Sequence, residues 1–356
     1  MPELPPPPLM QPPLVESPRR PRGRSSNKHA HHAAYTTDAS RYDRLSRAQG
    51  SESLLAALRA IFAARHACSP FGAATPDIVD IGTGSGKLLL LLCAWVGGGG
   101  VLHCLFICPC IVSLNAMRHC PDCPPPPPAP FARSAVGVDR ENDILNVARQ
   151  NLERAGSQNC SFAQADARTL PLPDASRDVA LAGWALCYLK AEYEFSDSSG
   201  RSWGPWRDEL DRALDEIDRV LRPGGVAVIL ESLGTATETP RRLRSQYYAH
   251  LRLRGFEETW VRTDYKFASQ AEAEALCLFF YGGAVSARVS ECQGCESGLV
   301  PECTGVWWRR RPLQHSSYAA DGACPPGSAY GAVAQLLLDG LIGSWTPDLA
   351  ASDVDQ

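Results

Sequence analysis

Hydrophobic and polar positions along the chain predict alternating strands and helices. Short apolar runs bounded by glycine, proline or acidic residues are typical of buried parallel strands, and they occur as a run ending at Asp80 and at 135–139, 161–165, 179–182 and 226–230. Helices are predicted at 88–95, 141–155 and 206–221, the last two with one apolar face. The alternation predicts an α/β fold: a doubly wound, mostly parallel seven-stranded Rossmann-like sheet with helices on both faces.

Further elements flank this core. Apolar residues at helical spacing from Leu54 to Phe62, with Ser51 or Ser53 as the cap, indicate a helix ahead of the first strand. This helix either covers a ligand cleft or packs on the sheet, and packing is favoured. After the core we expect a basic amphipathic helix at 240–253, a strand at 256–267, a helix at 271–281 and an aromatic strand at 305–308 that closes the sheet.

A glycine-rich turn, PDIVDIGTGSG at 76–86, joins the first strand to the next helix. Gly82, Gly84 and Gly86 allow unusual backbone dihedrals and a close approach of a ligand to the backbone amides, and the helix amino end adds partial positive charge. Strand-to-helix turns that bind nothing can look the same. The loop is therefore a candidate site for a nucleotide-type ligand.

The domain organisation follows from composition. Residues 1–34 are rich in proline and arginine and are predicted to be disordered, and residues 316–356 to be a weakly ordered tail. One domain is expected over 35–315, with its core at 76–232 and the sheet completed by 240–311. A Cys- and Pro-rich segment at about 97–134 interrupts the core as an insertion. The uncharged stretch 88–117 resembles a membrane span, but four glycines divide it, so a span is not expected.

Charge and cysteine content indicate which binding partners and which cellular compartment to expect. The 356 residues carry a net charge of −4, which gives no general attraction to nucleic acid or to an anionic membrane. No signal-peptide pattern opens the chain, so its 14 cysteines are expected to be free thiols in the reducing cytoplasm. A basic cluster at residues 19–24 leaves the nucleus as an alternative location.

Two CxxC pairs raise the alternative of a zinc-binding module. Cys120 and Cys123 form one pair, and Cys292 and Cys295, with Cys303 nearby, form the other. Unligated thiols are the favoured interpretation, and no metal is expected.

Acidic residues follow three successive predicted strands. Asp80, Asp139 and Asp166 stand where the strands end. Because open α/β sheets bind ligands at the carboxyl ends of their strands, we expect these acids on one edge. An acid after the second strand accepts hydrogen bonds from ribose hydroxyls in dinucleotide folds, so Asp139 is the candidate ribose ligand, although an acid at a helix amino end also fits.

The order of these motifs resembles the class I S-adenosylmethionine-dependent methyltransferases, specifically a fungal-like type 11 group. The matching pieces are VDIGTGSG (79–86), VGVDR (136–140), AQADARTLPLPD (163–174), DVALAGWALCYL (178–189) and LRPGG (221–225). TDYKF (263–267) and CTGVWWR (303–309) resemble the carboxyl end of fungal members. GxGxG, in place of the GxGxxG of nicotinamide enzymes, also favours methyl transfer.

The resemblance implies that S-adenosyl-L-methionine is the cofactor and assigns roles to residues. Asp80, Gly82, Gly84 and Gly86 would hold its methionine part, with Thr83 in the same loop. Asp139, followed by Arg140, would bind the ribose, and Asp166 with Ala167 the adenine edge. Residues 182–184, including Gly183 and Trp184, would form the wall beside the reactive methyl group.

The methyl acceptor, a protein or a small molecule, is not identified by the sequence, and neither is the oligomeric state. A general base is optional, so no catalytic residue is assigned; the candidates are Glu231, Tyr188, Tyr247, His250 and Asp264. The Asn/Asp-Pro-Pro-Tyr motif of amino-group methylation is missing from the fourth strand motif, which disfavours bases and glutamine as acceptors. A methyltransferase-like binding protein without catalytic activity is the alternative.

Overall fold

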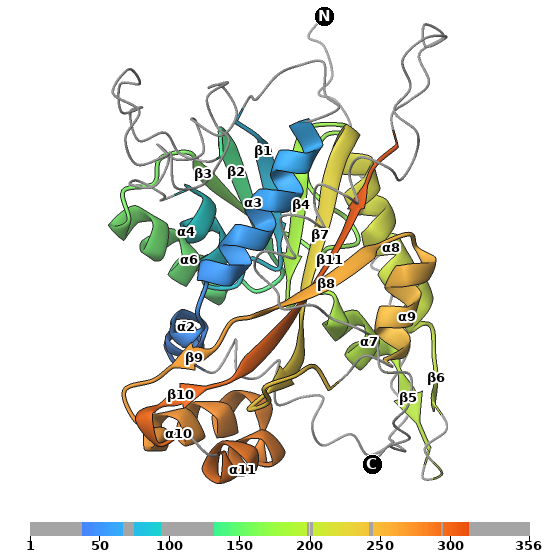
Figure 1. Ribbon diagram of the computed structural model, residues 1–356. Helices are drawn as coiled ribbons and strands as arrows, with labels where there is room; N and C mark the ends of the chain where they lie inside the picture. Colours follow the sequence, from blue (N-terminus) through green and yellow to red (C-terminus); the bar gives the residue numbers. More distant parts are fainter. Residues whose placement is uncertain are drawn as a thin grey trace, which may run out of the picture.

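The computed structural model describes residues 38–66, 75–93 and 132–312, except 198, 200, 201, 242–244, 293 and 294. Its centre is a seven-stranded sheet in the order β3-β2-β1-β4-β7-β11-β8 (Figure 1). These strands are β1 (Asp77–Ile81), β2 (Ser134–Asp139), β3 (Cys160–Gln164), β4 (Arg177–Gly183), β7 (Leu221–Thr235), β8 (Glu257–Arg262) and β11 (Glu302–Arg310). Neighbours from β3 to β7 are parallel, and β11 is antiparallel to β7 and β8.

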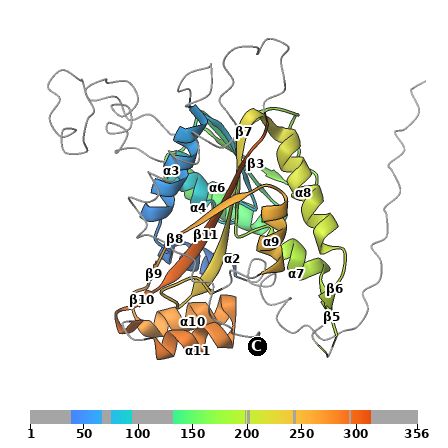
Figure 2. The same ribbon diagram turned by 45° about the vertical axis from the view of Figure 1, so that its right-hand side comes forward.

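Helices cover both faces of the sheet, so the predicted fold class is confirmed. One face carries α3 (Glu52–His66), α4 (Lys87–Cys93) and α6 (Asn142–Arg154), and the other carries α7 (Cys187–Tyr193), α8 (Trp206–Val220) and α9 (Gln246–Leu253) (Figure 2). A small hairpin, β5 (Phe195–Ser196) and β6 (Ser202–Trp203), joins α7 to α8. Every residue of β1 is buried because both faces of this central strand are covered.

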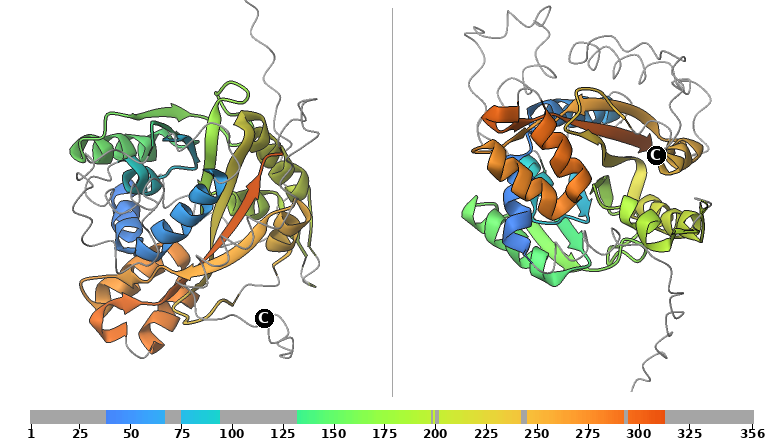
Figure 3. Two further views of the ribbon diagram at one scale, coloured as in Figure 1. Left: turned by 45° about the horizontal axis from the view of Figure 1, so that its top comes forward. Right: turned by 90° about the horizontal axis from the view of Figure 1, so that it is seen from below.

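A second body, which we call the cap, lies at the carboxyl edge of the sheet. It consists of α2 (Ala39–Ala48) and residues 265–300, which form β9 (Tyr265–Lys266), α10 (Gln270–Tyr281), α11 (Gly283–Glu291), the 3-10 turn η2 (Cys295–Ser297) and β10 (Leu299–Val300) (Figure 3). The cap has an apolar core of its own, in which Leu45 of α2 packs with Phe280 of α10 and Val289 of α11. The segment between β8 and β11 therefore folds against a helix from the start of the described chain.

Several predicted boundaries differ from the structure. β1 continues past Asp80 to Ile81, and α4 ends at Cys93, the last residue described there. β7 runs from Leu221 through Gly224 and Gly225, which were expected to separate a helix from a strand. The pairing of β4 with β7 shifts register at this point, so the glycines form an irregularity within the strand.

The carboxyl-terminal elements are also arranged differently. The strand expected at 256–267 is divided into β8 and β9, and the helix expected at 240–253 is α9, which begins only at Gln246. Helix α11 follows α10 after the turn at Gly282 and was not predicted. The aromatic strand β11 does not close the sheet at its edge: it lies between β7 and β8, and β8 is the edge strand.

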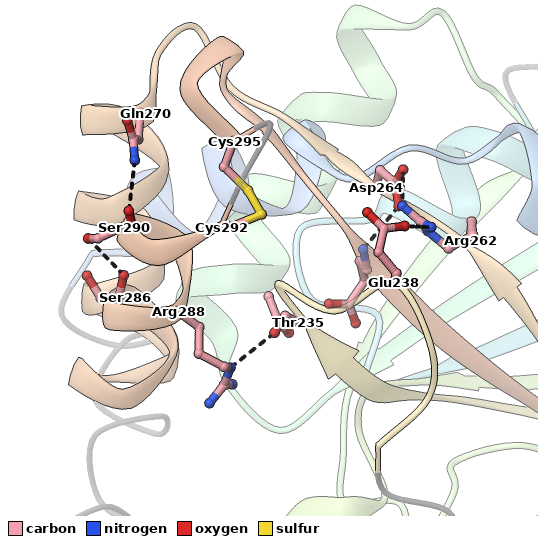
Figure 4. The surroundings of a disulfide bond; sticks show 11 residues. Thr235, Glu238, Arg262, Asp264, Gln270, Ser286, Arg288, Ser290, Cys292 and Cys295 are labelled. Carbon is pink, nitrogen blue, oxygen red and sulfur yellow. Dashed lines mark hydrogen bonds and ion pairs between the residues drawn. A yellow bond between two sulfur atoms is a disulfide. The ribbon is translucent and has the colours of Figure 1, made fainter.

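The expectation of free thiols is wrong for one pair of cysteines. Cys292 and Cys295 form a disulfide bond at the end of α11 (Figure 4). Five other described cysteines are thiols, and Cys303 among them is buried. Because the two bonded sulfur atoms are not thiolates, they cannot ligate zinc in this state, and no cluster of possible metal ligands occurs within the described residues.

Some predictions fall on other parts of the chain. Residues 1–34, residues 97–131 of the proposed insertion (with Cys120 and Cys123) and residues 316–356 lie outside the described residues. Within the described ranges, no helix has the length and apolar character required to cross a membrane.

Candidate functional site

A cavity opens at the carboxyl edge of the parallel strands. It contains about 870 Å³ of free space, its open mouth included. The loops that follow β1, β2, β3 and β4 line it, together with Tyr42 of α2 and the first two turns of α7. This is the edge at which open α/β sheets bind ligands.

The glycine loop forms one wall, and its three glycines share a left-handed backbone but face different neighbours. Gly82, Gly84 and Gly86 have φ values of +68°, +55° and +84°, which disfavour side chains. A Cβ on Gly82 would lie 2.3 Å from the Cβ of Ala185. Gly84 faces Tyr42, whereas Gly86 faces α6, so Gly82 and Gly84 line the cavity and Gly86 does not.

Asp139, at the end of β2, links the second strand to the glycine loop. Its Oδ2 accepts a hydrogen bond from the Gly84 amide at 2.9 Å, and its Oδ1 accepts one from the Glu141 amide at 3.0 Å. Burial raises the pKa of this carboxyl group, although the two amides act in the opposite direction. Each carboxylate oxygen has a second lone pair, so Asp139 can still accept hydrogen bonds from a ligand in the cavity.

Asp166, after β3, lines the same cavity and is paired with Arg168. The Arg168 guanidinium donates to both carboxylate oxygens, at 2.8 and 2.7 Å, and its backbone amide donates to Oδ1 at 2.9 Å. Hydrogen bonding to Arg168 lowers the pKa of Asp166. Asp166 is therefore held ionised and oriented at the cavity wall, a fixed hydrogen-bond acceptor.

The remaining predicted residues divide into two groups. Arg140, Ala167, Gly183 and Trp184 line the cavity, whereas Asp80 and Thr83 do not. Arg140 forms an ion pair with Glu192 of α7 at 3.1 Å, and both residues line the cavity. Trp184 follows β4 with a φ of +52°, and its amide donates to the Leu230 carbonyl at 2.7 Å.

Asp80 is buried beneath the glycine loop. Its Oδ2 accepts a hydrogen bond from the Thr83 hydroxyl at 2.7 Å, and its Oδ1 has no hydrogen-bond partner among the described residues. Burial raises the pKa of Asp80 to about 7, and the Asp139 charge adds to this rise. Asp80 therefore supports the loop from below, and it has no direct access to the cavity.

Of the candidate bases, only Tyr188 lines the cavity. The others have structural partners. Glu231 is buried and accepts hydrogen bonds from the Tyr247 hydroxyl at 2.9 Å and the Cys187 amide at 3.1 Å. His250 is hydrogen-bonded to Asp211, and Asp264 is paired with Arg262.

Sequence reasoning missed Tyr42. This side chain lies over the glycine loop: a Cβ placed on Gly84 would be 3.4 Å from its ring and from its hydroxyl oxygen. The α2 helix that carries Tyr42 begins at the N-cap Asp38, whose carboxylate accepts a hydrogen bond from the Arg41 amide at 2.9 Å. Aspartate is a favoured N-cap residue, so Asp38 was a local signal for a helix start. Nothing in the local sequence indicated that this helix covers the glycine loop. The expected helix, α3, packs on the sheet as favoured.

Comparisons with known proteins match part of the chain, including the part of the site after β2, β3 and β4, to a methyltransferase domain. Residues 127–229 match the family model Methyltransf_11, described as a methyltransferase domain. A curated relative, the uncharacterized methyltransferase YcgJ of Bacillus subtilis (strain 168), is 28% identical over 103 residues, which are 29% of this chain and 34% of that protein. The chain thus matches about a third of the length of this relative.

The solved structures that resemble this chain have low sequence identity to it. The putative methyltransferase BH2331 of Bacillus halodurans C-125 is 15% identical with a TM-score of 0.39, covering 74% of this chain and 100% of that one. The structure of YcgJ from Bacillus subtilis is 14% identical with a TM-score of 0.37, covering 72% and 100%. These likenesses carry no information about the reaction. The family match is what supports a methyltransferase, and it spans residues 127–229.

Proposed function

We propose that this protein is an S-adenosyl-L-methionine-dependent methyltransferase that acts on an unidentified protein or small-molecule acceptor. The observation that carries the proposal is that Gly84, Asp139 and Asp166 meet on one cavity, in a chain whose residues 127–229 match a methyltransferase domain. These three residues lie as many as 82 positions apart in the sequence (166 − 84), so their convergence is a property of the fold.

The cavity suits the proposed cofactor in shape and in chemistry. Gly84 leaves open a space that a side chain would fill, between the loop and Tyr42. The two acids, Asp139 and Asp166, are hydrogen-bond acceptors, as the ribose hydroxyls and the adenine amino group require.

The residues take the roles that their positions allow. Gly82 and Gly84 would approach the methionine part, Asp139 the ribose and Asp166 the adenine, while Gly183 and Trp184 form the adjoining wall. Asp80, Thr83 and Gly86 would act one layer below, because they shape the loop without reaching the cavity. This modifies the roles expected from the sequence for Asp80 and Gly86.

The chemistry that S-adenosyl-L-methionine supplies is a methyl group already activated on a sulfonium. What remains for the protein is to align the acceptor and to exclude water. Tyr42 lies over the glycine loop, and the apolar side chains of Leu186 and Leu189 also line the cavity. We assign no general base.

A binding experiment tests the proposal. We expect S-adenosyl-L-methionine to bind the wild-type protein in isothermal titration calorimetry, and Gly84→Arg to abolish binding because the new side chain occupies the space beneath Tyr42. Gly283→Arg is the matched control, since a Cβ at Gly283 meets no atom within 4 Å and this residue begins α11 in the cap. Equal binding by wild type and Gly84→Arg, with both proteins folded by circular dichroism, would refute the cavity assignment.

Turnover separates an enzyme from a binding protein. With labelled cofactor and a cell extract, an enzyme transfers label to an acceptor and releases S-adenosylhomocysteine, whereas a binding protein does neither. The same labelling identifies the acceptor as protein or small molecule. The fungal-like subgroup and the cytoplasmic location stay proposals, the first resting on segments 263–267 and 303–309 and the second tested by cell fractionation.

A further inference from the structure

Asn151 is a polar residue on the buried face of α6, where its neighbours are apolar. Only 3% of its surface is exposed, and Ala148 and Leu152 beside it are fully buried or nearly so. A buried amide without hydrogen-bond partners is costly, because it has lost its bonds to water. A polar side chain in such a place therefore indicates partners that use its hydrogen bonds.

The partners of Asn151 belong to two different parts of the site. Its Nδ2 donates to the backbone carbonyl of Ser85, in the glycine loop, at 2.9 Å, and to Oδ1 of Asp43, on α2, at 3.0 Å. Both protons of one amide are thus used. A single side chain joins the loop beside the cavity to the helix above it.

This link contributes to the orientation of α2, which also packs in the cap through Leu45. Asp43 follows Tyr42, and successive residues of a helix point about 100° apart. When Asp43 is held toward α6, Tyr42 faces Gly84, whose Cβ position lies 3.4 Å from the tyrosine ring. Other contacts join α2 elsewhere: the Arg41 guanidinium donates to the Ala275 carbonyl of α10 at 3.1 Å.

A second tie lies at the end of α2 and does not replace the first. The Lys87 ammonium donates to the backbone carbonyl of Gln49 at 3.0 Å and to its side-chain oxygen at 2.9 Å. Gln49 follows the last residue of α2, so this tie holds the helix end near α4. The bond through Asn151, in contrast, reaches the residue next to Tyr42.

We infer that Asn151 is a positioning residue of the cofactor pocket: its amide holds α2 against the glycine loop and so places Tyr42 over Gly84. This inference rests on the proposed function, because it assigns Asn151 to the same pocket. Asn151 itself does not line the cavity and does not touch a ligand there. Its effect on binding therefore passes through Tyr42.

The test measures the affinity for S-adenosyl-L-methionine by calorimetry at about 15 °C, well below unfolding. Asn151→Leu keeps the branching at Cγ and removes the hydrogen bonds to Ser85 and Asp43, together with the one that Arg154 donates to Oδ1 at 3.4 Å. We expect affinity to fall about tenfold, the effect of one to two hydrogen bonds. Asn146→Leu is the matched control on the same helix, because Asn146 is exposed and bonds to Arg149 of α6. It should bind as the wild type does.

Two further comparisons separate positioning from general stability. If Asn151 acts through Tyr42, the double variant Asn151→Leu/Tyr42→Ala binds no more weakly than Tyr42→Ala alone. In Asn151→Asp two carboxylates face each other and the donor to the Ser85 carbonyl is lost. Adding Asp43→Asn restores the hydrogen bond between α2 and α6, though not the one to Ser85, and should recover part of the lost affinity. The inference is overturned if the affinity losses of Asn151→Leu and Tyr42→Ala add in the double variant, or if Asp43→Asn recovers no affinity in Asn151→Asp.

The outcomes also separate the inference from the proposed function. If the wild-type protein does not bind S-adenosyl-L-methionine, the proposed function fails. If the wild type binds and Asn151→Leu binds equally well, with only a lower melting temperature, the proposed function stands and Asn151 has a structural role alone.

Discussion

Asp80 makes the stability of this fold depend on pH, and Asp80→Asn should remove that dependence. Burial raises the pKa of Asp80 from 3.8 to about 7 in the folded protein. The folded state therefore holds its proton more tightly than the unfolded state, so the stability associated with Asp80 is present at low pH and is lost as pH rises. The amide side chain of the variant does not titrate and has no such loss.

The magnitude follows from the two pKa values. Each pKa unit corresponds to 1.36 kcal/mol, so the full shift is worth about 4 kcal/mol. At about pH 5 wild type has lost roughly 2 kcal/mol of this, and at about pH 8 roughly 4 kcal/mol. The amide that Asp80→Asn introduces would place an unsatisfied NH group at the position of Oδ1, a cost of about 1–3 kcal/mol at every pH.

This cost is the same at both pH values, so it drops out when the stabilities at the two pH values are compared. We expect the free energy of unfolding of Asp80→Asn, relative to wild type, to increase by about 2–3 kcal/mol between pH 5 and pH 8. Urea unfolding followed by circular dichroism at both pH values measures it. A relative stability that is the same at both would show that Asp80 is not a protonated, buried acid and would refute the reasoning.

Asp77, on the same strand, is the control of opposite sign. Hydrogen bonds from Arg133, Ser134 and Arg222 hold its pKa well below the usual range. Its contribution to stability is present above its unfolded pKa, which lies below both test conditions. Asp77→Asn should therefore lose about the same stability at pH 5 and at pH 8.

Three further predictions concern the loop, its surroundings and the cap. Gly82→Ala should destabilise the protein by about 2 kcal/mol or more, measured by urea unfolding, because its Cβ would lie 2.3 Å from that of Ala185 and its φ is +68°; an unchanged midpoint would contradict this. Burial lowers the pKa of Lys87 from 10.5 to about 7, so the stability associated with Lys87 is lost as pH falls. Between pH 7 and pH 9 the free energy of unfolding of wild type, relative to that of Lys87→Met, should increase by at most about 2 kcal/mol. A constant difference would argue against a buried amine. Reduction of the Cys292–Cys295 disulfide, which closes a loop of four residues, should cost about 2 kcal/mol in urea unfolding; Cys292→Ser/Cys295→Ser should then show no response to reductant.

The acidic strand ends could be predicted because they follow from local patterns and one topological rule. Short buried strands can be read from the sequence, and the carboxyl ends of parallel strands meet at one edge. Gly84, Asp139 and Asp166 were placed together on that basis, and the structure brings all three to one cavity. That they bind a cofactor stays a prediction.

Asp80 is a residue for which this reasoning was not accurate enough. Its position one residue before the end of β1 puts its side chain under the loop, where it accepts a hydrogen bond from Thr83. Neighbouring residues of a strand point to opposite faces, so an error of one residue in a boundary decides between cavity and core. Sequence patterns do not fix strand ends to that accuracy.

The sequence by itself determined the α/β class, the glycine turn and the acids after the strands, because each depends on residues within a few positions of one another. Tertiary structure alone decided that β11 enters between β7 and β8 and that Cys292 and Cys295 are bonded within the cap. It also decided that Asn151 joins Asp43 to Ser85 and that Tyr42 covers Gly84. These contacts join residues that the chain separates by as many as 108 positions, and only the packing of the sheet with its helices brings them within hydrogen-bond distance.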